Sequence, residues 1–211
     1  MNRLVYIGGF LESKSCVKRV GEAFGQFGYD DVEPFTMQQA DEEHRRLRLA
    51  GRGGVAATHS AGALSLNGLG IKGAHLFAPP SPVPVSSFPL RTAQKTILSL
   101  QHCDAPERRQ AVIEYYRTSA AEAATHLLSY LQQLPAISRY DRVATASAMQ
   151  QAGVDVHVAA MTDDRFFPYS DGEKQRAARH DLDFVVLEGQ HDELEFNPEG
   201  VLTSYFAKIR Q

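Results

Sequence analysis

The sequence predicts an α/β fold in which helices cover both faces of a parallel sheet. Two observations predict it: short apolar runs alternate with helical segments over residues 4–78, and the same alternation resumes at 154. Between them, a proline-rich loop is followed only by helical signals. Because 211 residues suffice for one domain with a sizeable core, we expect a single domain over 1–211, with 82–135 as a helical cap insertion.

The first half of the chain contains four strand signals separated by three helical segments. Apolar runs bounded by glycine or polar residues predict the strands, and apolar spacings of three and four predict the helices. The charge run within 38–50 indicates a solvated helix face. The strands are expected at 4–7, 32–35, 53–58 and 73–78, and the helices at 13–28, 38–50 and 61–68.

The second half begins with prolines at 79, 80, 82, 84 and 89, which break the chain into an extended loop. A helical pattern follows between about 90 and 134, and its apolar face is expected at Ile113, Tyr116, Ala120, Ala124, Leu127, Leu131 and Leu134. Further helices are expected at 138–151, 170–180 and 198–210, and strands at 154–161 and 184–187.

Composition excludes several classes of function. A hydrophobic fraction of 43% and a net charge of −3 are ordinary for a globular protein and give no reason to expect nucleic-acid binding. No apolar run is long enough for a membrane span, and the first is too short for a signal peptide. Cys16 and Cys103 have no metal-ligand spacing, so we expect free buried thiols, a cytoplasmic location and no metal.

Ser60 stands at the centre of the most informative stretch, Val55-Ala56-Ala57-Thr58-His59-Ser60-Ala61-Gly62. A buried strand, a sharp turn and a helix predict a serine at the apex of an elbow, facing the positive end of the helix. Gly62 would let the helix approach the strand closely. The structural alternative is a serine that caps a helix.

Three strand ends carry the residue types of a hydrolytic triad. Ser60 follows one strand, Asp163 and Asp164 follow another, and His191 follows the last. The carboxyl ends of parallel strands meet at one edge of the sheet, so these groups are expected together. A histidine can activate a serine hydroxyl, and a carboxylate can orient that histidine.

Three other histidines are weaker candidates for the base. His157 lies inside a strand, and His180 lies at the end of a helix, where a charged histidine is stabilised. The side chain of His59 is expected to leave the elbow in another direction. His191 alone follows the last strand.

Four segments of this chain resemble motifs of the α/β-hydrolase family. T-H-S-A-G at 58–62 resembles the nucleophile elbow G-x-S-x-G, with Thr58 in place of the first glycine. Residues 164–168 are similar to the family's acid loop, and residues 189–191 are similar to its histidine loop. Residues 7–10 are similar to its H-G-F segment, with Gly8 in place of the histidine. The resemblance covers nearly the whole chain except 82–135, which falls where the family places its variable cap.

This resemblance implies a three-layer fold with about six parallel strands, lacking the first two strands of the full family fold. It implies a triad of Ser60, Asp164 and His191. Asp164 is favoured over Asp163 by its spacing to Pro168. The oxyanion donors would be the backbone N–H groups of Phe10 and Ala61.

The implied activity is that of a small serine hydrolase that cleaves an ester or related acyl bond through an acyl-serine. Its partner is a small-molecule acyl substrate, and no cofactor is needed. Thioesterases, amidases and carbon–carbon hydrolases use the same triad, so these alternatives stay open, as does a nonenzymatic small-molecule sensor on a hydrolase scaffold. A nucleotide-binding fold is disfavoured because Gly8-Gly9 lacks the G-x-G-x-x-G spacing.

The cap should cover Ser60 with its apolar face and form an apolar pocket. Phe166 and Phe167 are expected in the core or the pocket wall. Tyr115 and Tyr116 are expected to pack within the insertion, and Asp192 to lie at the surface.

Overall fold

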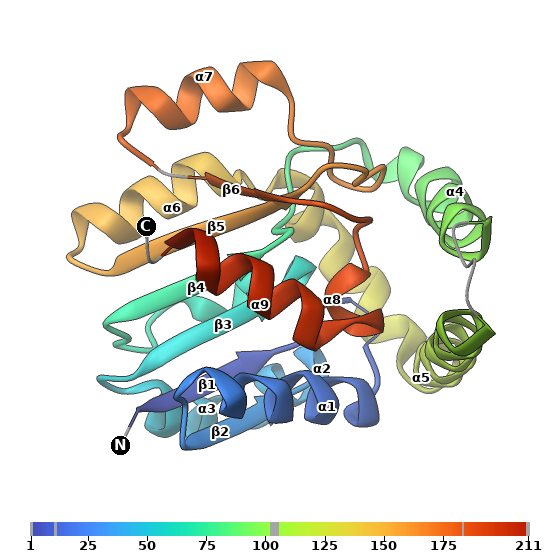
Figure 1. The fold of residues 1–211 in the computed structure, drawn as a ribbon, viewed down its shortest axis with the longest axis horizontal. Coiled ribbons are helices and arrows are strands. Elements are labelled where there is room, and N and C mark those ends of the chain that lie inside the picture. Colours follow the sequence, from blue (N-terminus) through green and yellow to red (C-terminus); the bar gives the residue numbers. More distant parts are fainter. Residues whose placement is uncertain (1, 11, 102–105, 183, 210–211) are drawn as a thin grey trace.

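The computed structural model describes residues 2–10, 12–101, 106–182 and 184–209, and this part of the chain contains one six-stranded sheet (Figure 1). All neighbouring strands are parallel, in the order β2-β1-β3-β4-β5-β6. The predicted parallel sheet of about six strands is confirmed. The strands are β1 Arg3–Ile7, β2 Asp31–Phe35, β3 Val55–His59, β4 Gly73–Phe77, β5 Asp155–Met161 and β6 Phe184–Leu187.

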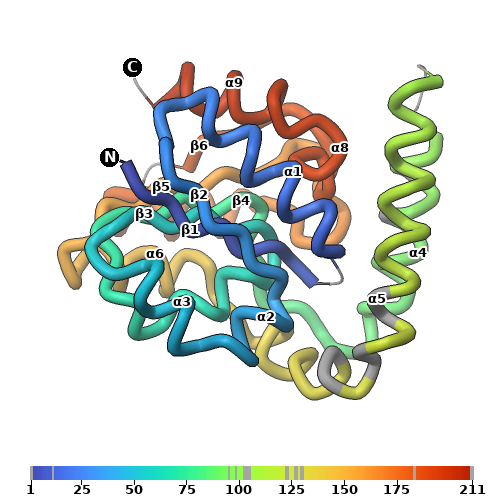
Figure 2. Tube along the Cα trace, turned by 90° about the horizontal axis from the view of Figure 1, so that it is seen from below, coloured from blue at the N-terminus to red at the C-terminus, as the bar shows by residue number. Residues whose placement is uncertain are grey.

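Helices cover both faces of the sheet, as Figure 2 shows. On one face lie α1 (Lys14–Phe24), α8 (Glu193–Phe196) and α9 (Pro198–Ile209). On the other lie α2 (Met37–Glu42), α3 (His44–Gly51), α6 (Arg142–Gln151) and α7 (Asp171–Arg179). The three layers follow from the sequence, because strands that are apolar on both sides must be covered on both sides.

Alternate side chains of β1 enter two separate cores. Leu4 and Tyr6 pack with Phe24 of α1 and Tyr205 of α9. Val5 and Ile7 point the other way, into the core formed with α3 and α6. Burying each large side chain contributes about 1.5–3 kcal/mol, so the two cores fix the strand register.

Three helices differ locally from the sequence expectation. The segment expected at 38–50 is two helices, because Glu43 leaves helical geometry at φ −105° and ψ 33°. The segment at 61–68 is a 3-10 helix, Ser60–Leu66, which keeps the turn after β3 tight. The first helix ends at Phe24, and a short 3-10 turn, Gly25–Phe27, continues it to Gly28 at φ 94°.

The insertion consists mainly of two helices, α4 (Phe88–Gln101) and α5 (Pro106–Arg139), with a 3-10 turn at Val85–Ser87 before them. α5 continues through Pro135 to Arg139, so the helix expected from 138 begins only at Arg142. The two helices stand side by side at one end of the molecule (Figures 1 and 2). Of the helices in the described ranges, none has the length and hydropathy needed to cross a membrane.

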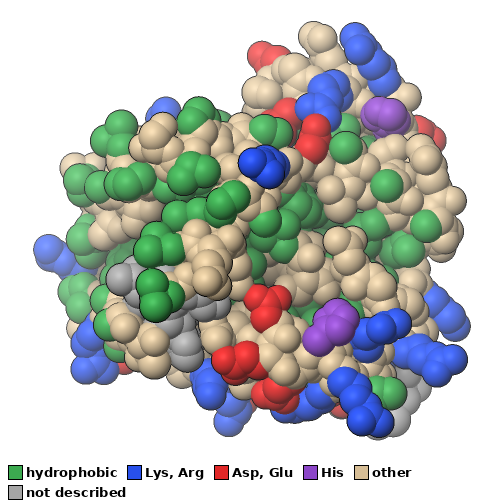
Figure 3. Space-filling model, turned by 180° about the vertical axis from the view of Figure 1, so that it is seen from behind, with side chains coloured by type: hydrophobic (Ala, Val, Ile, Leu, Met, Phe, Trp, Pro, Cys, Tyr) green, Lys and Arg blue, Asp and Glu red, His purple; other side chains and the backbone are tan. Residues whose placement is uncertain are grey.

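The predicted apolar face of α5 is confirmed only in part: Tyr116 and Leu134 pack against buried core side chains, but other members of the face do not. The side chains of Ile113 and Leu131 are 46% and 50% exposed, whereas Val112, Tyr115 and Ser119 are buried. One position corresponds to about 100° around a helix, so the face turned toward the protein overlaps the predicted one but is rotated toward Val112, Tyr115 and Ser119. Figure 3 shows hydrophobic side chains gathered on the side of the molecule where α4 and α5 lie. The side chain of Leu127 lies outside the described part.

Cys16 is free and buried, as expected, whereas Cys103 lies outside the described residues.

Candidate active site

The turn after β3 holds Ser60 in a strained backbone conformation. Its φ is 48°, in the left-handed region that costs a non-glycine residue about 1–3 kcal/mol. Gly62 lies so close to the chain after β1 that a Cβ there would be 2.5 Å from the Ile7 carbonyl oxygen and 2.6 Å from that of Gly8. Only glycine fits, so the elbow and the loop after β1 are locked together.

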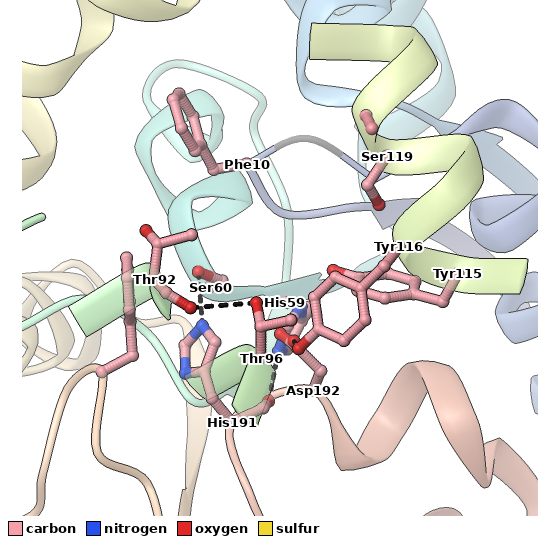
Figure 4. A pocket seen from close by; sticks show the side chains of 12 residues that line it. Phe10, His59, Ser60, Thr92, Thr96, Tyr115, Tyr116, Ser119, His191 and Asp192 are labelled. Carbon is pink, nitrogen blue, oxygen red and sulfur yellow. Dashed lines mark hydrogen bonds between the residues drawn. The ribbon is translucent and has the colours of Figure 1, made fainter. Parts of the chain in front are cut away.

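Ser60, His191 and Asp164 form a continuous hydrogen-bonded chain at the carboxyl edge of the sheet. His191 Nε2 lies 2.9 Å from Ser60 Oγ, and His191 Nδ1 lies 2.8 Å from Asp164 Oδ2. All three side chains are buried. Figure 4 shows His191 beside Ser60. The structure thus brings together the three residues that the sequence singled out, and an imidazole placed between hydroxyl and carboxylate can move a proton to and from the hydroxyl.

The alternative candidates do not join this chain. The Asp163 side chain is exposed, while its backbone N–H donates to the Gly189 carbonyl. His180 Nδ1 lies 3.2 Å from Ser147 Oγ, and the His157 ring stacks on His75. The turn at 162–164 therefore places Asp164, and not Asp163, against His191. The sequence favoured Asp164 only through its resemblance to the family's acid loop.

Asp164 is held by the backbone of its own loop. Its Oδ1 accepts hydrogen bonds of 2.8 Å from the N–H groups of both Phe166 and Phe167. Burial by itself raises the pKa of Asp164, but the charge of His191, these hydrogen bonds and nearby Arg142 outweigh burial and lower it. The carboxylate therefore stays ionised at neutral pH, as the orienting group of an imidazolium must.

Arg142 supports the acid loop and was not predicted. Its fully buried guanidinium donates to the carbonyls of Phe167 at 3.1 Å and Pro168 at 2.9 Å, and pairs with Glu173 at 2.7 Å. The sequence offered no signal for it, because an arginine at the start of an amphipathic helix is ordinarily solvated.

The two expected oxyanion donors belong to the elbow and to the loop after β1. Ala61 is buried directly after Ser60, and Phe10 follows β1 and borders the same cavity as Ser60 (Figure 4). The adjacent Gly9 is packed tightly: a Cβ there would lie 2.8 Å from Ser60 Cβ. The loop after β1 is thus positioned directly against the elbow.

A cavity of about 190 Å³ opens beside Ser60. The insertion forms much of its wall, through α4 and α5, so these helices border the candidate site. Phe166 lies in the wall, as expected, and Phe167 packs in the core beside it. The lining residues are Phe10, His59, Ser60, Thr92, Thr96, Tyr115, Tyr116, Ser119, Ala120, Phe166, His191 and Asp192.

Two expectations about this wall are wrong. Asp192 is 1% exposed rather than at the surface, and its Oδ2 accepts a hydrogen bond of 3.3 Å from the Tyr116 hydroxyl. Tyr115 and Tyr116 line the cavity instead of packing only within the insertion. The wall of the pocket is mostly apolar, as expected, with a few hydroxyls and a carboxylate among its aromatic side chains. The short helix α8 folds the chain after Asp192 back under α5, which no local pattern predicted.

Two groups of side chains in the described ranges have metal-ligand composition. His59, His191 and Asp192 form one, and Glu12, His59 and Glu195 form the other; within each group the candidate ligand atoms lie within 4.8 Å of one another. The first includes the histidine bonded to Ser60. The second lies behind the elbow.

No family model matches the sequence, and a search of curated proteins also finds no match. Solved structures do resemble the fold. An enol-lactonase from Burkholderia xenovorans LB400 superimposes with a TM-score of 0.65 at 12% identity, covering 100% of this chain and 92% of the other. A putative lipase from Acinetobacter baumannii AYE gives 0.65 at 13%, covering 99% and 83%. A thermophilic esterase from Thermogutta terrifontis gives 0.59 at 17%, covering 100% and 90%. The chain therefore has the α/β-hydrolase fold.

Proposed function

We propose that this protein is a serine hydrolase that cleaves an ester or related acyl bond through an acyl-serine intermediate. The observation that carries the proposal is the hydrogen-bonded chain from Ser60 Oγ through His191 to Asp164, in the wall of a cavity. The similar structures named lipase, esterase and lactonase agree with a hydrolase.

Each residue has a defined role in this reaction. Ser60 Oγ attacks the acyl carbon while His191 Nε2 takes its proton. The tetrahedral oxyanion accepts hydrogen bonds from the N–H groups of Phe10 and Ala61. His191 then protonates the leaving group, and afterwards activates the water that hydrolyses the acyl-serine. Asp164 holds His191 in the required tautomer and stabilises its charged form.

The cavity favours a small acyl substrate. Its volume of about 190 Å³ is below the range of about 300–1,000 Å³ that holds drug-sized ligands. Aromatic rings of Phe10, Phe166 and Tyr115 offer apolar contact. The triad does not distinguish an ester from a thioester, an amide or a carbon–carbon bond, and a sensor built on the scaffold would bind its ligand without turnover.

A fluorophosphonate probe tests the nucleophile. We expect labelling of Ser60 in the wild type, and loss of labelling and hydrolysis in Ser60→Ala. Ser147→Ala is the matched control, because Ser147 is a second buried serine in contact with a histidine. Label mapped to another serine, or hydrolysis retained by Ser60→Ala, would contradict the mechanism. Acetyl to octanoyl esters and the matching thioesters would then define the acyl group.

A further inference from the structure

Three ionisable side chains lie completely buried behind the candidate nucleophile. Glu12 comes from the loop between β1 and α1, His59 from the end of β3, and Glu195 from α8; each is at most 1% exposed. We call this set the buried triplet. Burying charged groups is costly unless they are paired, so an arrangement of two carboxylates and an imidazole requires an account of its charges.

Both ring nitrogens of His59 face acceptors. Nδ1 lies 2.6 Å from Glu12 Oε1 and also contacts Glu195 Oε1, and Nε2 lies 2.9 Å from the backbone carbonyl oxygen of His191. A neutral imidazole has only one N–H to donate, whereas an imidazolium has two. A cationic His59 can donate from both nitrogens, so the geometry fits an imidazolium paired with an ionised carboxylate. Burial lowers the pKa of His59, but Glu195 and Glu12 together raise it well above its ordinary value.

The two carboxyl groups have different charges. Glu12 also accepts hydrogen bonds from the Gly9 N–H at 2.5 Å and the Tyr6 hydroxyl at 3.3 Å. Burial raises the pKa of Glu12, but His59 and the hydrogen bonds from Glu195 and the Gly9 N–H outweigh it and lower that pKa to about 2. Burial and the charge of Glu12 instead raise the pKa of Glu195, so this carboxyl is protonated and can donate to Glu12. An ionised Glu12, a cationic His59 and a neutral Glu195 sum to no net charge.

The distances fit a proton better than a metal ion. Ligands that bind a tetrahedral zinc ion at about 2.0–2.1 Å are themselves more than about 3 Å apart. The Nδ1–Oε1 separation of 2.6 Å between His59 and Glu12 is a hydrogen-bond distance. As placed, the triplet is an ion pair of Glu12 and His59, joined by hydrogen bonds to the neutral Glu195.

This ion pair touches each of the three loops that build the candidate site. His59 is adjacent to Ser60 and holds the carbonyl of His191, and Glu12 holds the N–H of Gly9, next to Phe10. We propose that Glu12 and His59 are positioning residues, whose buried ion pair fixes the nucleophile, the base and the oxyanion loop relative to one another. This inference rests on the proposed function. A misplacement of about 1 Å can cost about 10²-fold in rate, so the pair should control turnover through the positions of the three loops and not by taking part in the reaction.

The two glutamates allow a sharp test, because the same substitution should act differently on each. Glutamine replaces a neutral glutamic acid well. In place of the ionised Glu12 it removes the carboxylate that balances the His59 imidazolium and leaves only Glu195, which must first give up its proton. We expect Glu12→Gln and His59→Gln to lower kcat by on the order of ten- to a hundredfold with KM changed less than about threefold. Glu195→Gln should keep kcat within about threefold of the wild type.

A double variant separates positioning from folding. Glu12→Gln combined with His59→Gln removes both charges, so it should regain much of the thermal stability that Glu12→Gln loses. Its kcat should remain low, because the contacts to Gly9 and His191 are altered. This variant also supplies a folded protein if Glu12→Gln alone does not fold. His75→Gln is the control: His75 is another buried histidine of the sheet, hydrogen-bonded by the hydroxyls of Tyr29 and Tyr205. It should lose stability and keep kcat.

The outcomes distinguish this inference from the proposed function. Absence of fluorophosphonate labelling in the wild type would overturn the function itself. A labelled wild type with equal kcat losses in Glu12→Gln and Glu195→Gln would overturn only the positioning role. Recovery of kcat together with stability in the double variant would also overturn it, since the ion pair would then be purely structural.

Discussion

Gly62→Ala should slow the enzyme by pushing the elbow away from the loop after β1. The new Cβ would lie 2.5 Å from the Ile7 carbonyl oxygen and 2.6 Å from that of Gly8, whereas real Cβ atoms essentially never approach closer than 3.0 Å. Both obstacles are backbone atoms, which cannot rotate away as a side chain can. One segment must therefore move by at least about 0.5 Å relative to the other.

The displacement falls between the two parts of the proposed oxyanion site. Phe10 follows Gly8 and Gly9, and Ala61 precedes Gly62. Since about 1 Å of misplacement can cost about 10²-fold, we expect kcat for a short-chain ester to fall on the order of tenfold or more. Overpacking should also cost about 1–3 kcal/mol of stability.

The assay compares kcat, the rate of fluorophosphonate labelling and thermal unfolding in the purified variants. Gly25→Ala is the control, because a Cβ at Gly25 meets nothing within 4 Å and the residue has helical geometry. It should keep full activity and equal or exceed the wild type in stability. If Gly62→Ala keeps kcat and labelling within twofold of Gly25→Ala, the close packing does not position the oxyanion site.

Three further predictions concern the acid, the cavity and pH. Asp164→Asn should lower kcat by about 10⁴, while Asp163→Asn, whose side chain is exposed, should stay within twofold; the reverse order would contradict the assignment. Ala120→Leu, in the cavity wall, should shift the kcat/KM ratio toward shorter acyl esters, whereas Ala124→Leu, exposed one turn further along α5, should leave the ratio unchanged. Burial, with the nearby His157, lowers the pKa of His75 to about 4. The stability that neutral His75 contributes is therefore complete above the ordinary histidine pKa and is lost as pH falls toward 4, by up to about 3 kcal/mol. Chemical denaturation at several pH values should show a shallower loss in His75→Gln, and equal slopes would contradict the expectation.

The sequence by itself determined the parallel sheet and the three strand ends that carry the candidate triad. Apolar runs such as those of β1 and β3 are local patterns, and they hold because each strand is buried on both faces. Ser60, the adjacent pair Asp163 and Asp164, and His191 could be grouped before any contact was known, because each follows the carboxyl end of a strand and those ends share one edge. Within the aspartate pair, the resemblance to the family's acid loop favoured Asp164. The insertion was visible because prolines end the alternation and no strand signal returns before 154.

The tertiary structure alone decided what surrounds these residues. Periodicity shows that α5 has an apolar side, but its neighbours determine whether Val112 or Ile113 is buried, because adjacent residues differ by about 100° around the axis. The burial of Asp192 and the existence of the buried triplet could not be predicted from the sequence either, because both depend on contacts between distant segments. Glu12, His59 and Glu195 are ordinary polar residues far apart in the chain, and only the parallel order of β1 and β3, with α8 folded against them, brings their charges together.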